Sequence, residues 1–324
     1  MRTLIALSIT ALSVSIGHSA QAGQVNLPGD MVSGGGHYIK LDNAYSEWQT
    51  SGEFITNSGA LDQDDRQQYS VRDHGNQWHH TLTYFFGLTD NWNLGLEQGY
   101  AESRWHHSQE DDALNPTEGS FESAGETDLA LLLKYRLAKG ASLNFDLSPP
   151  IAGANQARSN TSDSGQQGDE GHGYTQLGTE VAANWLTELG THWLGAIRLD
   201  LTTRDKVNGE GVSGPWCAAF NFGSNITLTE SQNLVFQWHL MRGFPYKSYN
   251  AALNKEISYG DQSRFGFNTK YQWNLTESLQ LQSYLNLAMT QPPVQKFSQA
   301  GVKQRVELTG GTYTTLGLAL KAEF

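Results

Sequence analysis

The chain has 324 residues, a formal net charge of −12 and an isoelectric point near 5.2. This acidic balance argues against nucleic acid as a partner, because nucleic-acid binding requires a basic surface. Cys217 is the only cysteine, which excludes an internal disulfide framework and paired-cysteine zinc motifs. Mean hydropathy is −0.48, and no apolar run after residue 16 approaches the ~20 residues that a transmembrane helix needs.

Residues 1–22 have the order of a secretory signal peptide. Arg2 supplies the positive start, Leu4–Ile16 is the apolar segment and Ala20–Ala22 is a small-residue cleavage motif. A membrane anchor is the alternative, but this apolar segment is too short to cross ~30 Å of hydrocarbon as a helix. We expect the mature chain to begin at Gly23, with 20 basic residues against 33 acidic ones. The sequence thus predicts a signal peptide over residues 1–22 and one folded domain over residues 23–324.

An alternation of apolar and polar residues recurs through this domain. From Leu279 to Met289, for example, mostly apolar residues occupy one parity and mostly polar residues the other. Because side chains alternate across a strand, each such segment has one apolar face. Twelve segments follow this pattern, at residues 34–41, 78–86, 92–100, 129–137, 143–147, 177–185, 193–201, 216–228, 234–240, 265–273, 279–289 and 316–324.

The connections between these segments alternate in length. Short polar turns are expected at residues 88–91, 138–141, 187–190, 229–232 and 275–278. Long polar loops are expected at residues 42–75, 104–124, 153–171, 205–213, 245–258 and 290–304. Strict alternation of short and long connections is typical of bacterial outer-membrane barrels with both termini in the periplasm. The predicted fold is all-β, a transmembrane antiparallel up-and-down β-barrel of about 12 strands.

Charged residues are confined to one parity of the predicted strands. None occurs on the apolar face, where Arg or Lys would cost ~2–4 kcal/mol at the membrane midplane. The opposite parity carries twelve candidates for lining the lumen: Glu97, Asp128, Lys134, Arg136, Asp146, Glu180, Arg198, Asp200, Arg264, Lys270, Lys321 and Glu323. A soluble barrel with its apolar face inside would show the same alternation, so this pattern alone leaves both folds open.

Aromatic residues favour the membrane protein. Trp78 and Phe86 lie eight residues apart on the apolar face, and so do Trp92 and Tyr100. Eight residues at ~3.3 Å each, tilted by ~40°, span roughly 20 Å, close to the ~25 Å apolar band between two aromatic girdles. We therefore expect the cell outer membrane as the location, with the lipid bilayer and lipopolysaccharide as surroundings.

Three segments resemble known outer-membrane proteins. The terminal strand ends on Phe324, which resembles the signal read by the barrel assembly machinery. FGLTDNWNLGL at residues 86–96 and GETDLALLLKYRL at residues 125–137 resemble the MetA-pathway of phenol degradation family, although Glu126 stands where that family has glycine. The resemblance implies a transporter-like barrel that passes small, often hydrophobic, molecules. It assigns no binding residue.

Catalytic and metal-binding patterns are weak. There is no G-x-S-x-G motif, and His107-Ser108 lies among acidic residues, so we predict no enzyme. His79 and His80 are adjacent on a strand and would point to opposite faces. His106-His107 and the acidic clusters at 62–65, 110–112 and 169–170 fit solvated loops better than a calcium or magnesium site. We expect no cofactor and no metal, and Cys217 as a small residue of the lumen wall.

The twelve lumen candidates decide between the remaining functions. Six are basic and six acidic, whereas a strongly selective pore would show one sign. The charges either line a wet, weakly selective channel for small-molecule solutes or pair to plug a narrow barrel. The sequence favours the channel or uptake barrel. A structural or interaction barrel with a plugged lumen is the alternative, followed by a lipid-modifying enzyme.

Overall fold

The computed structural model describes residues 31–57, 67–110, 117–150, 174–187, 192–203, 205–207, 210–250, 255–299 and 302–324. The predicted signal peptide and its cleavage site lie outside these residues. Among the described residues, no helix has the length and apolar character needed to cross a membrane.

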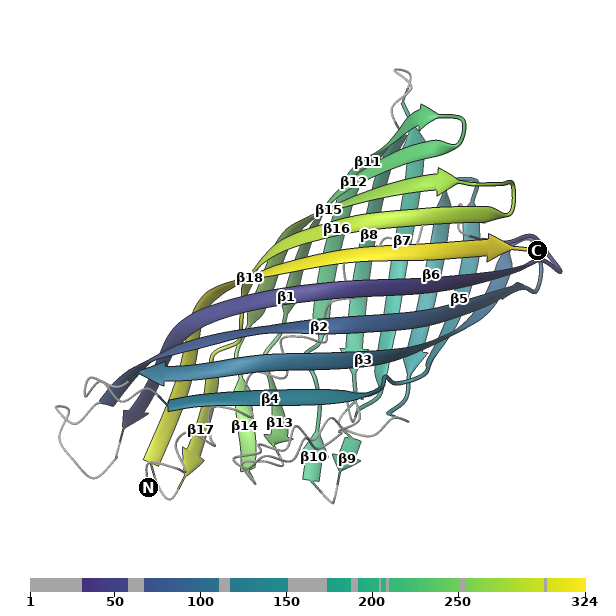
Figure 1. The fold of residues 1–324 in the computed structure, drawn as a ribbon. Coiled ribbons are helices and arrows are strands. Elements are labelled where there is room, and N and C mark those ends of the chain that lie inside the picture. The colour runs from purple at the N-terminus through teal and green to yellow at the C-terminus, as the bar shows by residue number, and fades with distance from the viewer. Residues whose placement is uncertain are drawn as a thin grey trace.

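Twelve antiparallel strands form a closed barrel (Figure 1). Each pairs with its neighbours in the chain, and the last strand returns to the first, so that no strand of this wall has a free edge. The strands are β1 (His37–Asn57), β2 (Gln67–Gly87), β3 (Trp92–Glu110), β5 (Ala130–Ala138), β6 (Ala141–Ser148), β7 (Gln176–Leu186), β8 (His192–Thr202), β11 (Cys217–Thr229), β12 (Gln232–Gly243), β15 (Gln262–Asn274), β16 (Leu279–Gln291) and β18 (Val302–Glu323). The predicted fold class is confirmed.

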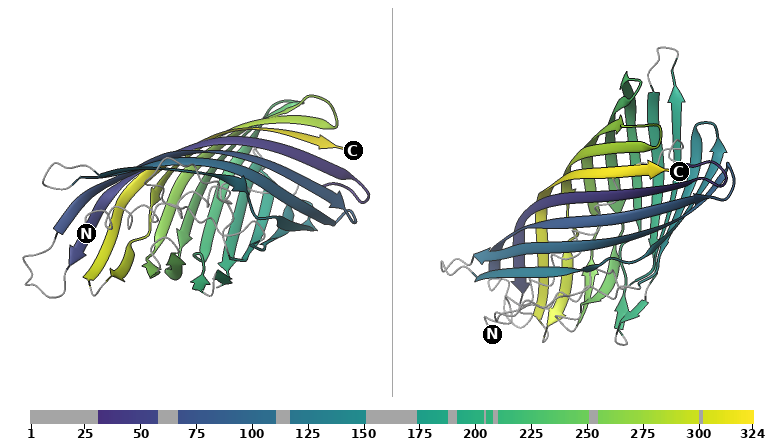
Figure 2. Two further views of the ribbon diagram at one scale, coloured as in Figure 1. Left: turned by 60° about the horizontal axis from the view of Figure 1, so that its bottom comes forward. Right: turned by 45° about the vertical axis from the view of Figure 1, so that its right-hand side comes forward.

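The ends of the barrel differ. The short connections and the C-terminus lie together, and the backbones of His37 and Phe324 exchange two hydrogen bonds there, of 2.8 and 3.0 Å. Figure 2 shows the C-terminal strand (yellow) lying between the first strand (purple) and its green neighbour. The end with short turns faces the periplasm in outer-membrane barrels.

Six further strands lie at the other end, and four of them extend the wall (Figure 1). They are β4 (Thr117–Glu126), β9 (Asp205–Val207), β10 (Glu210–Val212), β13 (Tyr246–Asn250), β14 (Lys255–Tyr259) and β17 (Gln295–Gln299). β4 pairs with β3, while β17, β14 and β13 follow β18 in order. β9 and β10 pair with each other as a separate two-stranded sheet.

The expected long loops at residues 42–75, 104–124, 205–213, 245–258 and 290–304 are therefore wrong in extent, because most of their described residues are strand. The pairing of β1 with β2, for instance, continues to Thr56 and Gln67. Beyond the bilayer the outward face meets water, so polar residues occupy it and the alternation disappears while the backbone pairing persists. Hydropathy therefore marks the membrane-spanning part of a strand rather than its full length.

The barrel is apolar outside and polar inside. Leu318, on the outward parity, is 51% exposed, whereas Lys270, on the inward parity, is 7% exposed. Large apolar side chains are exposed around the wall, among them Leu82, Leu94, Leu131, Leu199, Phe220, Leu240, Phe265 and Leu287. Such a surface is stable only against hydrocarbon, and a closed barrel is the sheet that satisfies every wall hydrogen bond there. The protein is an outer-membrane β-barrel.

Candidate functional site: the barrel lumen

The structure places the predicted lumen residues as follows. Seven are buried inside the barrel: Asp128, Lys134, Glu180, Asp200, Arg264, Lys270 and Lys321. Four are partly buried: Glu97, Arg136, Asp146 and Arg198. Glu323 is exposed at the short-turn end, where it forms an ion pair of 2.7 Å with Lys321. Their part in solute passage remains a prediction.

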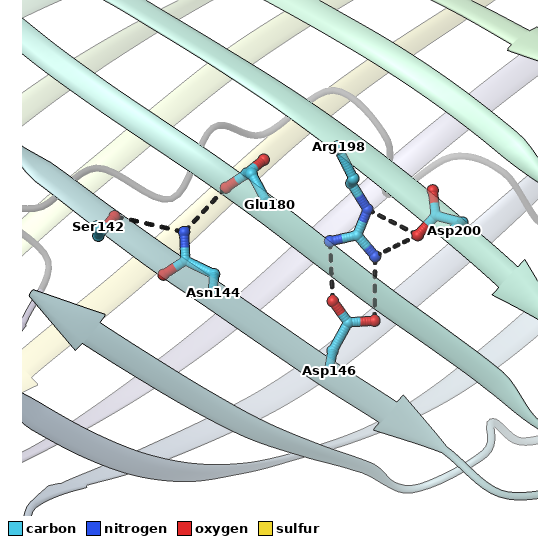
Figure 3. A network of polar contacts seen from close by, with 6 residues as sticks. All are labelled: Ser142, Asn144, Asp146, Glu180, Arg198 and Asp200. Carbon is cyan, nitrogen blue, oxygen red and sulfur yellow. Dashed lines mark hydrogen bonds and ion pairs between the residues drawn. The ribbon is translucent and has the colours of Figure 1, made fainter. Parts of the chain in front are cut away.

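Three of these residues form one ion-pair cluster on β6 and β8 (Figure 3). The Arg198 guanidinium donates to both carboxylate oxygens of Asp146, at 2.8 and 3.0 Å. Its Nε and Nη2 donate to Asp200 Oδ1, at 2.8 and 2.6 Å. One cation thus holds two carboxylates, one of them two strands away, and the cluster keeps a net negative charge.

Gly178 on β7 makes this cluster possible. It lies directly opposite both Asp146 and Asp200 in the strand register. A Cβ atom at this position would overlap the Arg198 guanidinium and both Asp146 carboxylate oxygens. The missing side chain therefore lets Arg198 reach from β8 across β7 to β6.

A third carboxylate lies beside the cluster. Glu180, buried on β7, is the register partner of Arg198 and accepts a hydrogen bond of 3.1 Å from Asn144 Nδ2. Lys134 on β5 lies opposite Asn144, with its ammonium 4.5 Å from the Phe85 ring centroid. The wall from β5 to β8 thus carries both signs at close range, an arrangement in which charges neutralise one another.

The segment before β1 is held against the inner face of the wall at the short-turn end. The Asn93 carboxamide binds the backbone of Val32 twice, accepting from its N–H at 2.8 Å and donating to its carbonyl at 2.9 Å. Val32 also packs against Tyr38 and Phe85. The Asn93 carboxamide thus pairs with the Val32 backbone as a residue of a neighbouring strand would, and this holds residues 31–36 in place. Asn93 was not among the residues predicted to line the lumen, and its only signal in the sequence is an amide at an inward position.

An apolar cluster lies inside the opposite end of the barrel. Phe54, Val71, Ile257, Tyr259, Phe297, Val306 and Leu308 form one buried cluster from β1, β2, β14, β17 and β18. Phe54, Val71, Ile257 and Phe297 come from segments that the sequence predicted as polar loops, and the other three lie just beyond the ends of those segments. Their inward parity becomes recognisable only once the strands are known to continue beyond the bilayer.

The other chemical candidates are scattered. Cys217 is buried at an inward position opposite Asp200. His80 is exposed and hydrogen-bonds Asn43, while His106 is exposed with its ring 5.0 Å from that of His74. Within the described ranges, no group of three or more His, Cys, Asp or Glu side chains could hold a metal ion. The acidic clusters at 62–65, 111–112 and 169–170 lie outside the described residues, and the side chains of His107 and Glu110 are likewise not described.

No protein-family model and no curated protein matches this sequence. Among solved structures, an outer-membrane channel from Pseudomonas putida F1 is similar at a TM-score of 0.49 and 15% identity, over 93% of this chain and 100% of that one. A Pseudomonas aeruginosa FadL homologue gives 0.45 and 8% over 88% and 90%, and the translocator domain of the autotransporter NalP from Neisseria meningitidis gives 0.40 and 12% over 100% and 94%. Similarities of this size identify no family and transfer no substrate, so the resemblance to the MetA-pathway of phenol degradation family remains a prediction.

Proposed function

We propose that this barrel passes small molecules across the outer membrane. The observation that carries the proposal is the polar interior of the membrane-spanning wall. Instead of an apolar core, it presents paired charges along β5 to β8 and buried carboxamides such as Asn221, Asn268 and Asn286. Burying polar groups without hydrogen-bond partners is costly. A polar interior of this kind is therefore stable where water or a polar solute enters the barrel and supplies those partners.

The balance of charge indicates weak ion selectivity. Arg198 is held between Asp146 and Asp200, and Lys321 pairs with Glu323. Since neighbouring opposite charges cancel at a distance, no single sign dominates the path of a solute. Small solutes of low net charge are thus better suited to the lumen than strongly charged ones.

A plugged structural barrel is the second candidate. It is favoured by the ion-pair cluster and by the Val32 segment that Asn93 holds at the short-turn end. The plug differs from the channel in one physical respect: a dry interior must satisfy all of its polar groups internally. The carboxamide oxygens of Asn221, Asn268 and Asn286 have no hydrogen-bond partner in the described part of the chain, which favours the channel.

Planar-bilayer recordings across a salt gradient test the proposal. We expect discrete conductance steps, and Lys270→Glu should move the reversal potential toward cation selectivity with an unchanged melting temperature in detergent. Lys139→Glu is the matched control, because it makes the same charge change on an exposed residue of the β5–β6 turn. Absence of current in both proteins, together with a lowered melting temperature for Lys270→Glu, would favour the plugged barrel.

The proposal extends to the protein's surroundings. The exposed apolar wall supports the bilayer and lipopolysaccharide as its environment, and Phe324, exposed at the end of β18, supports recognition by the barrel assembly machinery. Export of the chain requires the signal peptide proposed over residues 1–22.

A further inference from the structure

One row of inward-facing positions crosses β12, β15, β16, β18, β1, β2, β3 and β4 and contains no charged residue. Eight buried residues follow one another as direct register partners on eight neighbouring strands. We call them the polar row: Gln237, Asn268, Asn286, Thr315, Ser46, Gln77, Ser103 and Ser123. All are amides or hydroxyls. This row therefore differs in chemistry from the charged wall of β5 to β8.

The adjacent row of inward positions is aromatic. Tyr313 and Trp48 are register partners, and Gly75 separates Trp48 from Trp105. A Cβ atom on Gly75 would overlap the Trp48 ring and the Trp105 side chain, so the glycine leaves room for both indoles. Trp48, Trp105 and Tyr313 form one buried cluster with Ala288, here called the aromatic row.

Hydrogen bonding is incomplete where the two rows meet. Ser46 bonds Thr315 at 3.0 Å and Gln77 bonds Ser103 at 2.9 Å, so part of the polar row is internally satisfied. Within the described structure, however, Asn268 Oδ1 and Asn286 Oδ1 have no partner, nor do Trp48 Nε1 and Tyr313 OH. Folded proteins rarely bury such atoms without a partner, which points to a solute or water as the missing one.

We propose that the polar and aromatic rows bind a small neutral solute with hydroxyl or amide groups around an apolar ring face, as in a neutral sugar. This inference rests on the proposed channel function and names the class of molecule that crosses. The carboxamide oxygens accept from the solute's hydroxyls, Trp48 and Tyr313 donate to its oxygens, and the indoles contact its ring face. A solute with both hydrogen-bond donors and acceptors satisfies the carboxamide oxygens of the polar row and the Trp48 and Tyr313 donors of the aromatic row.

The charges flanking the rows bear on this choice. Arg264 and Lys270 lie on β15 on either side of Asn268. The Arg264 guanidinium carbon lies 4.8 Å from the Tyr313 ring centroid, so this cation is engaged by the aromatic face. A charged solute entering the rows would lose hydration without meeting a counter-charge in either of them. An anionic solute is the alternative that the experiment separates.

Swelling of proteoliposomes in isotonic glucose, gluconate and glucosamine measures the preference. We expect glucose to enter fastest in the unaltered protein. Asn286→Leu should slow glucose entry about five- to ten-fold, the effect of one lost hydrogen bond, and change gluconate entry little. Gln282→Met, a buried amide on the same strand outside both rows, is the matched control and should leave glucose entry unchanged.

Tyr313→Phe removes only the hydroxyl and keeps the ring, so it tests the site even if Asn286→Leu folds poorly. Slower glucose entry with intact conductance for this variant supports the inference. Passage of all three solutes at equal rates, or faster gluconate entry, overturns the neutral-solute site and leaves the channel intact. Failure of every solute to enter, with no conductance, overturns the channel itself and the site with it.

Discussion

At the scale of residues, Arg198 shows that a single lumen side chain can hold two carboxylates in place. It satisfies two carboxylates that would otherwise repel each other, and its own charge is largely buried. The inward position of Arg198 followed from parity, but its partners did not, because Asp146 lies 52 residues away and two strands across. The contribution of Arg198 to the stability of the barrel therefore depends on contacts that form only when the barrel is folded.

Arg198→Met should destabilise the detergent-solubilised barrel by about 3–5 kcal/mol, because it leaves two neighbouring carboxylates without their cation. The free energy of unfolding in denaturant measures this loss. Adding Asp146→Asn and Asp200→Asn to the variant removes the stranded charges and should recover most of the stability. An equal loss in the single and triple variants would contradict the ion-pair explanation.

At the scale of elements, two hydrogen bonds from the Asn93 side chain hold the segment before β1 at the short-turn end of the barrel. Residues 31–36 lead into β1, with Gly35 at φ +81°, a backbone conformation that favours glycine. Gly35 N–H donates to the Gly87 carbonyl at 2.7 Å, and Asn93 binds Val32. The position of the segment thus depends on the turn between β2 and β3.

Asn93→Leu should free this segment, because it removes both hydrogen bonds to the Val32 backbone at a cost of about 1–3 kcal/mol. We expect a larger or more variable single-channel conductance than in the unaltered protein. Asn91→Leu makes the same exchange on an exposed residue of the turn that precedes β3 and should leave conductance unchanged. Identical recordings from the two variants would show that the segment does not restrict the lumen.

At the scale of the whole molecule, the inverted distribution of polarity determines where the barrel is stable. Leu318→Arg should cost about 2–4 kcal/mol when the protein is refolded into lipid vesicles, because the new charge faces hydrocarbon near the midplane. Ser51→Arg adds the same side chain to an exposed position on the extension of β1 and should change the unfolding free energy little. Equal effects of the two changes would contradict the placement of the bilayer around Leu318.

The sequence by itself determined which side chains face lipid and which face the lumen. Leu318 and Lys270 could be assigned to opposite faces because the side-chain period of a strand is two and hydrocarbon tolerates no charge. The tertiary structure alone decided the contacts inside the barrel. Closure brings β18 against β1, so that Ser46 meets Thr315 and Trp48 meets Tyr313. Periodicity records the direction of a side chain within one strand, whereas its partners on other strands depend on closure and register, which no single strand encodes.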